Sequence, residues 1–309
     1  MKRWVFLFPG QGSQYVGMGK DFYENYPKVR ELFHRADEIL GMDITRLCFE
    51  GPEDVLTQTH NVQPAITVAN LACLTVLAHH EIFPAAAAGH SLGEYSALYA
   101  AGVLSLEDTL KLVRWRGLYM HEASLETPGA MAAVMDMPEE RLQNLCRLCD
   151  VEIANINSPD QVIITGPVDA VDKALKASAA EGAKKCVKLN VSGPWHSRCM
   201  ESARQKFEPH VRAAAFADPT IPIVNNVDAT PLKDAAEAPE KLVRQICGAV
   251  LWKQSMEWFL ANGYDHFVEV GPKKVLRGLL RRIDRKVTIH NVEDAATLAS
   301  FLQANGAEV

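Results

Sequence analysis

The spacing of apolar residues along the chain predicts buried strands that alternate with amphipathic helices. The run from Trp4 to Phe8 is apolar at every position and ends at Pro9-Gly10, which is typical of a strand covered on both faces in a parallel sheet. Elsewhere, apolar residues at helical spacing and stop signals such as Gly41 indicate helices. The pattern predicts helices over residues 29–40, 63–79, 106–120, 138–149, 168–181, 200–215 and 273–285. It predicts further strands over residues 130–134, 151–157, 162–165, 186–191, 223–224 and 267–270.

The order of these elements divides the chain. From about residue 128 the predicted order is strand, helix, strand, strand, helix, strand, which is the ferredoxin-like arrangement. We therefore expect a small ferredoxin-like domain over residues 128–194 that is inserted into a larger α/β domain. The larger domain would comprise residues 1–127 and 195–309 and would contain the parallel sheet.

A serine flanked by glycines follows a run of small apolar residues. Residues 89–93 read Gly-His-Ser-Leu-Gly, the G-x-S-x-G pattern, and the helix-compatible residues 95–101 come next. On a sharp turn from strand to helix, the hydroxyl of Ser91 would be pushed clear of the backbone as a nucleophile. Backbone N–H groups at the start of the helix would stabilise a developing oxyanion. The pattern by itself also fits a plain glycine-flanked turn with a capping serine.

A second glycine-rich segment follows the first predicted strand. Residues 10–14 read Gly-Gln-Gly-Ser-Gln, and ligands of open α/β sheets bind at such carboxyl ends of strands. Tyr15 stands where a dinucleotide fingerprint needs its third glycine, and Asp21 follows Gly19-Lys20 where a P-loop needs serine or threonine. The segment therefore matches neither nucleotide-binding motif.

Composition narrows the class of protein. Of the 309 residues, 48% are hydrophobic and 23% are charged, and the net charge is −6 with a pI of about 5.9. This is ordinary globular composition, and it does not favour nucleic-acid binding. No apolar run approaches the roughly 18 residues of a membrane span, and no signal peptide is expected. Cys146 and Cys149 form a lone C-x-x-C among seven cysteines without paired-looking spacing. We therefore expect no metal, no membrane and a location in the reducing cytoplasm.

A serine nucleophile needs a base. Among ten histidines, His196 is the candidate because it lies in a loop bounded by Gly193-Pro194 where a new segment begins. His90 directly precedes Ser91, so its side chain would point the other way along an extended chain and line the pocket instead. No aspartate between Ser91 and His196 lies in a convincing strand-end loop. A neutral acceptor is therefore expected to orient the imidazole.

Together, these pieces resemble the malonyl-CoA:acyl-carrier-protein transacylase family of fatty acid synthesis, to which acyltransferase domains of polyketide synthases are related. The resemblance extends from residue 4 to about residue 290. Residues 10–14 look like the first signature of the family, and residues 89–95 look like its nucleophile elbow. The other matching segments are Arg116-Gly117 with Met120, residues 129–134, residues 155–159, residues 195–197 and residues 269–272.

The resemblance implies a fold and a reacting pair. The fold would be an α/β-hydrolase-like large domain with a mainly parallel sheet and a ferredoxin-like insert, with the site in the cleft between them. Ser91 would carry the acyl group and His196 would be the base. Gln245 falls where the family has a residue whose backbone carbonyl orients the histidine, which fits the lack of a convincing acid.

The resemblance also implies how the substrate is held. The backbone N–H groups of Gln11 and Leu92 would form the oxyanion hole, and Arg116 would pair with the free carboxylate of a malonyl group. His90 and Gln11 would lie beside the substrate. Two residues depart from the family pattern: His121 replaces a common glutamine, and Trp195 stands where serine or phenylalanine is common. Trp195 would lie near the acyl pocket, so the strictness of malonyl selectivity stays open.

The expected activity is ping-pong transfer of malonyl from malonyl-CoA to the phosphopantetheine thiol of acyl carrier protein, by a monomer that needs no cofactor. The alternatives are a hydrolase that clears acyl groups from carriers, an acyltransferase dedicated to polyketide synthesis, and a non-catalytic docking partner of a synthase. The carrier is expected to dock through local basic residues, although solvated faces explain them equally well. The candidates are Lys184, Lys185, Lys188, Lys273, Lys274 and Arg277.

Overall fold

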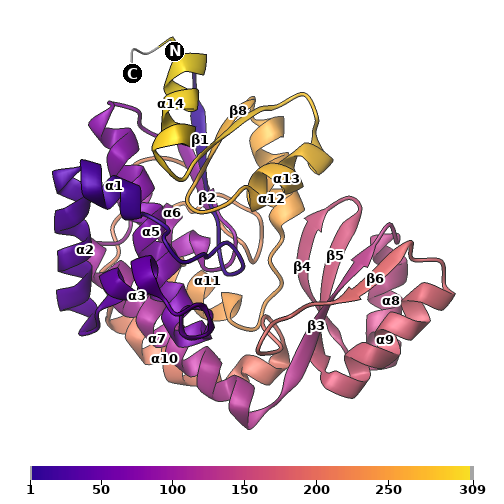
Figure 1. Ribbon diagram of the computed structural model, residues 1–309. Coiled ribbons are helices and arrows are strands. Elements are labelled where there is room, and N and C mark those ends of the chain that lie inside the picture. Colours follow the sequence, from indigo (N-terminus) through magenta and orange to yellow (C-terminus); the bar gives the residue numbers. More distant parts are fainter. Residues whose placement is uncertain (1, 307–309) are drawn as a thin grey trace.

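Within the residues that the structure describes, nine strands form two separate sheets (Figure 1). The structure is a computed structural model that describes residues 2–306. The strands are β1 Trp4–Phe8, β2 Ala86–Gly89, β3 Gly129–Met135, β4 Glu152–Ser158, β5 Gln161–Pro167, β6 Lys185–Lys188, β7 Ile223–Val224, β8 His266–Val270 and β9 Thr288–Val292. One sheet has the order β7-β2-β1-β8-β9, and its paired strands are all parallel. The other has the order β4-β5-β3-β6, and its paired strands are all antiparallel.

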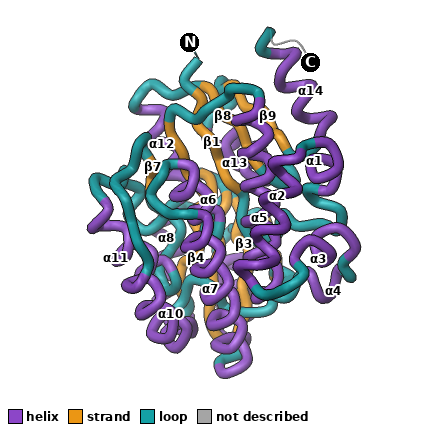
Figure 2. The backbone as a smooth tube through the Cα atoms, turned by 90° about the vertical axis from the view of Figure 1, so that its left-hand side faces the viewer, coloured by secondary structure: helices purple, strands orange, loops and turns teal. Residues whose placement is uncertain are grey.

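Helices surround the parallel sheet, and two of them, α8 and α9, accompany the antiparallel sheet (Figures 1 and 2). The α-helices are α1 Lys20–Asn25, α2 Pro27–Leu40, α3 Ile44–Glu50, α4 Glu53–Leu56, α5 Thr59–His79, α6 Gly93–Ala100, α7 Leu106–Glu126, α8 Glu139–Cys149, α9 Val168–Ala180, α10 Glu201–Ala213, α11 Ala238–Gln245, α12 Trp252–Ala261, α13 Val275–Ile283 and α14 Ala295–Ala304. Two short 3₁₀ turns are η1 Arg198–Met200 and η2 Ala235–Glu237.

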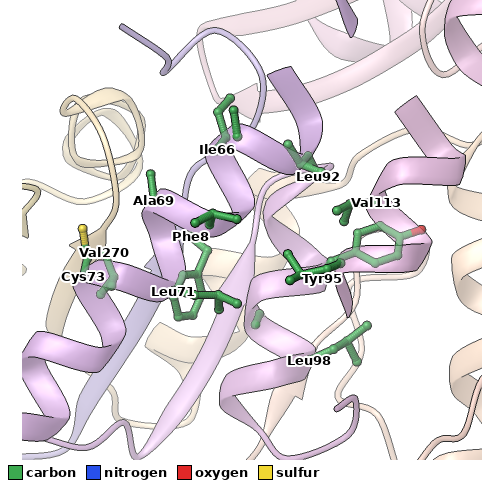
Figure 3. Packing of buried hydrophobic residues seen from close by; sticks show 14 of the residues in the cluster. Phe8, Ile66, Ala69, Leu71, Cys73, Leu92, Tyr95, Leu98, Val113 and Val270 are labelled. Atoms are coloured by element: carbon green, nitrogen blue, oxygen red, sulfur yellow. The ribbon is translucent and has the colours of Figure 1, made fainter. Parts of the chain in front are cut away.

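Strand β1 is covered on both faces, as its continuous apolar run predicts. Phe6 and Phe8 belong to the apolar cluster shared with α5, α6 and α7. Val5 and Leu7 belong to a second cluster formed with α12 and α13 on the opposite face. Figure 3 shows side chains of β1, α5, α6 and α7 meeting in the first cluster. This double covering fixes β1 and β2, and with them the loops that follow both strands.

The central helix α5 corrects one expectation from the sequence. It is 21 residues long, and an 18-residue window of it reaches a mean hydropathy of 1.4, so by length and composition it could cross a membrane. The length of this apolar helix is not evident from the sequence, because scattered polar residues such as Asn61 and Asn70 interrupt the apolar positions. However, 78% of that window is buried inside the protein, where α5 packs along α7. α5 is therefore a buried core helix of the protein.

Pro64 lies within α5 rather than at its start, because the helix begins five residues earlier, at Thr59. Proline has no backbone N–H, so Pro64 leaves the carbonyl of His60 without its helical donor. The guanidinium Nη1 of Arg114 donates to this carbonyl at 3.0 Å. The His60 carbonyl thus forms a hydrogen bond that links α5 to α7, close to the site described below.

The predicted helices and strands are found, but several elements were not predicted. The prediction missed α1, α3, α4, α11, α12, β9 and α14. In β9, the polar residues His290 and Asn291 interrupt the apolar run, so the strand lacks a clear apolar pattern. Strand β6 ends at Lys188, three residues before the predicted end, and the chain then continues as a loop over the site.

Candidate active site

Ser91 lies on the tight turn between β2 and α6. Its backbone adopts the left-handed region with a φ of 51°, which is uncommon for a residue with a side chain. The two flanking residues must be glycines because no side chain fits at either position. A Cβ atom on Gly89 would lie 1.9 Å from the carbonyl group of Gly93, and one on Gly93 would lie 2.0 Å from the carbonyl oxygen of Phe8. The G-x-S-x-G pattern therefore forms the strained strand-to-helix turn that the sequence predicts.

Asn226 holds this turn from the loop that follows β7. Its Oδ1 accepts a hydrogen bond from the Ser91 backbone N–H at 2.7 Å, and its Nδ2 donates to the Gly89 carbonyl at 2.7 Å. One amide side chain thus satisfies a donor and an acceptor of the strained backbone. The sequence analysis missed Asn226, and only its position just after a short predicted strand could have suggested it.

Ser91 and His196 lie within hydrogen-bond distance, although 105 positions separate them in the chain. The distance between Ser91 Oγ and His196 Nε2 is 2.7 Å. On the other side of the ring, His196 Nδ1 lies 2.9 Å from the backbone carbonyl oxygen of Gln245. A carbonyl can only accept, so Nδ1 carries the proton in this arrangement and the neutral Nε2 is left to accept the serine proton.

The surroundings keep His196 neutral. Burial, reinforced by the nearby positive charge of Arg116, lowers the pKa of His196 to about 3. An imidazole with such a pKa is unprotonated at neutral pH. It can therefore act as a general base toward the hydroxyl of Ser91 without first losing a proton.

Arg116 comes from the middle of α7 and is buried, with 2% of its surface exposed. Its Nη1 donates to Gln63 Oε1 at 2.8 Å, and its Nη2 donates to Ser91 Oγ at 3.1 Å and to Gln245 Oε1 at 3.0 Å. Within residues 2–306, its Nε has no hydrogen-bond partner and its guanidinium forms no ion pair with a carboxylate. A buried cation that is met only by neutral oxygens is prepared for an anionic ligand.

The neighbouring glycine explains how α7 reaches this place. A Cβ atom on Gly117 would lie 2.9 Å from the carbonyl oxygen of Thr59 and 3.1 Å from the Cα of His60. Because Gly117 has no side chain, α7 crosses the start of α5 in close contact. The Arg116-Gly117 pair thus combines the functional side chain with the residue that allows the crossing.

A cavity of about 730 Å³ lies in front of Ser91, between the two sheets. From the part containing the parallel sheet it is lined by residues of the glycine-rich loop, Ser91, Arg116 and α13. From the antiparallel sheet it is lined by residues such as Met131 and Asn155, and the loop 189–192 closes one side. A volume of this size is typical of small-molecule binding sites.

The two backbone amides expected to bind an oxyanion are available. Among residues 2–306, neither the N–H of Gln11 nor that of Leu92 has a hydrogen-bond acceptor. Leu92 is the N-cap of α6, where positive partial charge collects. A Cβ atom on Gly10 would lie 2.4 Å from the His90 carbonyl oxygen, so Gly10 allows the glycine-rich loop to approach this turn closely. The side chain of Gln11 donates to Thr59 Oγ1 at 3.3 Å.

His90 lines the cavity and is hydrogen-bonded to the antiparallel sheet. Its Nε2 lies 2.8 Å from Asn157 Oδ1 on β4, and its ring packs against Trp252 at a centroid distance of 5.4 Å. Burial lowers the pKa of His90. The residue therefore links the nucleophile turn to the antiparallel sheet.

The two departures from the family pattern occupy different environments. Trp195 is buried and lines the cavity beside His196. His121 lies outside the cavity lining and packs against His60 at a ring-centroid distance of 4.6 Å. Cys146 and Cys149 are buried in the core beneath the antiparallel sheet as free thiols, and the described residues contain no cluster of three metal-ligating side chains.

Comparison with known proteins gives the family. The model of the acyl transferase domain family matches residues 5–307. The chain belongs to this acyl transferase family. Within it, the chain groups with the malonyl-CoA:acyl-carrier-protein transacylases, as the motifs indicate.

Three relatives illustrate how complete the similarity is. The malonyl CoA-acyl carrier protein transacylase of Bacillus subtilis strain 168 is 40% identical over 308 residues, which is 98% of this chain and 97% of the relative. The crystal structure of MCAT from Streptococcus pneumoniae superimposes with a TM-score of 0.95 at 40% identity, over 98% of this chain and 100% of that one. A malonyl-transacylase in complex with its type II PKS acyl-carrier protein superimposes with a TM-score of 0.94 at 37% identity, over 98% and 100% of the two chains.

Proposed function

We propose that this acyl transferase moves a malonyl group from malonyl-CoA to the phosphopantetheine thiol of an acyl carrier protein, for fatty acid synthesis. The observation that carries this proposal is the 2.7 Å contact between Ser91 and His196 directly beside the buried Arg116. The contact can supply a nucleophile and its base, and the guanidinium can bind a carboxylate on the acyl group. Relatives named malonyl CoA-acyl carrier protein transacylase at about 40% identity support the same activity.

The first half-reaction would form an ester on Ser91. The Oγ atom attacks the thioester carbonyl carbon while His196 Nε2 takes its proton, and the amides of Gln11 and Leu92 donate to the oxyanion. When the intermediate collapses, the C–S bond breaks. The coenzyme A sulfur then leaves with the proton from His196. Arg116, through its unpartnered Nε and its Nη groups, would hold the malonyl carboxylate.

The second half-reaction would reverse these roles with a new thiol. His196 takes the proton of the carrier's phosphopantetheine thiol, and the sulfur attacks the ester carbonyl carbon. The C–O bond to Ser91 then breaks, and Oγ recovers its proton from His196. This cycle consumes no further reagent and requires no cofactor.

A hydrolase that edits acyl groups is the weaker alternative. Such an enzyme gains nothing from a buried cation beside the acyl group, whereas malonyl carries the carboxylate that Arg116 can bind. A carrier of polyketide synthesis stays a second candidate partner, because the solved structure of one relative shows it in complex with a type II PKS acyl-carrier protein.

The carrier is expected to approach α13. Val275, Leu276 and Leu279 of this helix line the cavity, and Lys273 donates to the Gly12 carbonyl of the glycine-rich loop at 3.3 Å, whereas Lys274 and Arg277 line a second, smaller pocket. On the antiparallel sheet, Lys184 and Lys188 already pair with Asp136 at 3.5 Å and Asp172 at 2.8 Å, respectively. Lys274 also pairs with Glu293, at 3.9 Å, so within residues 2–306 two of the three candidates beside α13 are without an ion pair, against only Lys185 on the sheet. We therefore take the start of α13 as the electrostatic docking site.

We also propose a finer description of the fold and its setting. The parallel sheet with the serine turn after β2 supports an α/β-hydrolase-like domain of residues 1–127 and 195–309. The order β4-β5-β3-β6, with an apolar cluster of its own, supports a ferredoxin-like inserted domain of residues 128–194. Seven free thiols fit a cytoplasmic protein. The monomeric state stays a prediction.

The test is an assay with malonyl-CoA, with and without carrier protein, that follows free coenzyme A, malonyl-carrier and free malonate. A transferase yields malonyl-carrier, a hydrolase yields malonate, and a non-catalytic protein yields neither. Intact-protein mass spectrometry should find a malonyl adduct on the wild-type protein and none on Ser91→Ala. An adduct on Ser91→Ala would end the assignment of the nucleophile.

A further inference from the structure

One buried carboxylate near the site has no part in the reaction just described. Glu94 lies in the first turn of α6, three residues after Ser91, and only 1% of its surface is exposed. Its Oε2 accepts a hydrogen bond from Gln245 Nε2 at 2.6 Å and another from the Asn226 backbone N–H at 3.3 Å. Burying an ionised carboxylate lowers the stability of the folded protein unless a nearby positive charge or hydrogen bonds offset the loss of hydration.

The nearby charge is that of Arg116, and Gln245 connects the two. The Gln245 amide donates to Glu94 through Nε2 and accepts from Arg116 Nη2 through Oε1 at 3.0 Å. An ionised carboxylate only accepts, so Glu94 forces the NH₂ group of Gln245 toward itself and the oxygen toward Arg116. Nε2 also donates to the Ser91 carbonyl at 3.0 Å, and the Gln245 backbone carbonyl faces His196.

This arrangement separates the counter-charge from the guanidinium by one neutral amide. A carboxylate in direct contact with Arg116 would occupy the place of the substrate carboxylate. One that is a single amide away still offsets the positive charge, yet it leaves guanidinium N–H groups available. We propose that Glu94 is a positioning residue that fixes the Gln245 amide and moderates the attraction of Arg116 for the malonyl carboxylate. This inference rests on the proposed function.

The moderation has a direct consequence for selectivity. The negative charge of Glu94 repels the malonyl carboxylate as well as stabilising free Arg116. Removing that charge while keeping the hydrogen bonds should therefore favour malonyl over acetyl. Because both hydrogen bonds of Glu94 end on the single atom Oε2, the one amide oxygen of a glutamine can accept both. Glu94→Gln thus removes the charge with little change of geometry.

The experiment compares kcat/KM for malonyl-CoA and acetyl-CoA in wild-type protein, Glu94→Gln and Glu94→Asp. Burial raises the pKa of Glu94 to about 7, so the assays are run near pH 8 to keep it ionised. We expect the malonyl-to-acetyl ratio to rise about three- to thirtyfold in Glu94→Gln, as expected for a charge removed two hydrogen bonds away. Glu94→Asp keeps the charge but shortens the reach, so it should slow both substrates while keeping the wild-type ratio.

Glu269→Gln is the matched control. Glu269 is equally buried, its pKa is also raised to about 7 by burial, and it accepts from the backbone N–H groups of Leu276 and Arg277. It is not hydrogen-bonded to the Gln245 amide or to Arg116, so its substitution should leave the ratio unchanged. A second readout is thermal: formation of malonyl-Ser91 should raise the Tm of Glu94→Gln more than that of wild type, because the acyl carboxylate replaces the lost counter-charge.

The outcomes separate the proposals. An unchanged ratio in Glu94→Gln, or a changed ratio in Glu94→Asp, would mean that Glu94 acts through geometry alone and would overturn the inference. If Glu94→Gln does not fold, a changed ratio in Glu94→Asp still refutes the charge effect and an unchanged one still supports it. A wild-type protein that forms no malonyl ester would instead overturn the proposed function, and this inference with it.

Discussion

Replacing Arg116 by alanine should change which acyl group the enzyme accepts. The guanidinium is buried, and its acceptors are the three neutral oxygens of Gln63, Ser91 and Gln245. In the proposed complex, it becomes the partner of a desolvated malonyl carboxylate. Removing one member of such a pair typically costs about 2–5 kcal/mol. At about 1.4 kcal/mol per factor of ten, kcat/KM for malonyl-CoA should fall about thirtyfold to several thousandfold.

Acetyl-CoA carries no carboxylate, so its kcat/KM should fall little or rise, since a buried cation no longer has to be accommodated. The assay measures both thioesters on wild type, Arg116→Ala and Arg114→Ala. Arg114 lies two residues away on α7 and donates to the His60 carbonyl, outside the cavity lining. Its substitution tests general damage to the helix and should affect both substrates equally. Equal losses for the two thioesters in Arg116→Ala would refute a role in carboxylate recognition.

Two further predictions concern the base and the carrier. His196→Ala should slow acylation roughly a hundredfold or more. In the wild type, the acylation rate with acetyl-CoA should not fall between about pH 8 and pH 5, because the lowered pKa of about 3 keeps the His196 imidazole neutral. A fall near the ordinary histidine pKa of about 6.5 would contradict this. The same shift makes the folded protein lose stability as pH falls from about 6.5 toward 3, where the unfolded state binds more protons. Reversing the charges of Lys273, Lys274 and Arg277 should raise the KM for the carrier protein and leave the KM for malonyl-CoA nearly unchanged. The control is the double variant Lys185→Glu with Lys188→Glu. Equal effects on both KM values would instead indicate that these residues contact the coenzyme A phosphates.

Much of the fold follows from local pattern. The apolar run of β1 and the helical periodicity of α2, α7 and α9 specify how each segment buries its surface, and the structure places these segments as predicted. The apolar pattern does not predict an element whose buried residues include polar side chains. In β9, Asn291 is buried but tolerated because its Nδ2 donates to the carbonyls of Lys273 at 2.8 Å and of Gly271 at 3.3 Å. The ring of His290 packs against Trp4 and Phe301.

The site divides in the same way. Ser91 could be proposed from local sequence because its turn needs glycines at fixed positions, and those glycines can be read directly. The position of His196 in a Gly-Pro loop is a weaker signal, and the structure adds what spacing could not supply, namely a distance of 2.7 Å across 105 positions. Arg116 would pass as an exposed helix residue without the family resemblance, since nothing in the helix pattern indicates that it is buried.

Three residues of the site that no local pattern indicates share one property: they act on backbone groups or through another side chain. Only Gln245 among them was expected, from the family resemblance. Asn226 holds the peptide groups on either side of His90, Gln245 offers a carbonyl on one side and an amide on the other, and Glu94 reaches Arg116 only through that amide. No aspartate between Ser91 and His196 lies in a convincing strand-end loop, whereas Glu94 follows the serine by only three positions. A triad acid would have to touch the imidazole, and Glu94 does not; its oxygen faces the glutamine that supplies the imidazole with a neutral acceptor. Keeping the carboxylate one amide away leaves His196 without an anionic partner and Arg116 without a direct one, so the only carboxylate in direct contact with the guanidinium would be the one that the substrate brings.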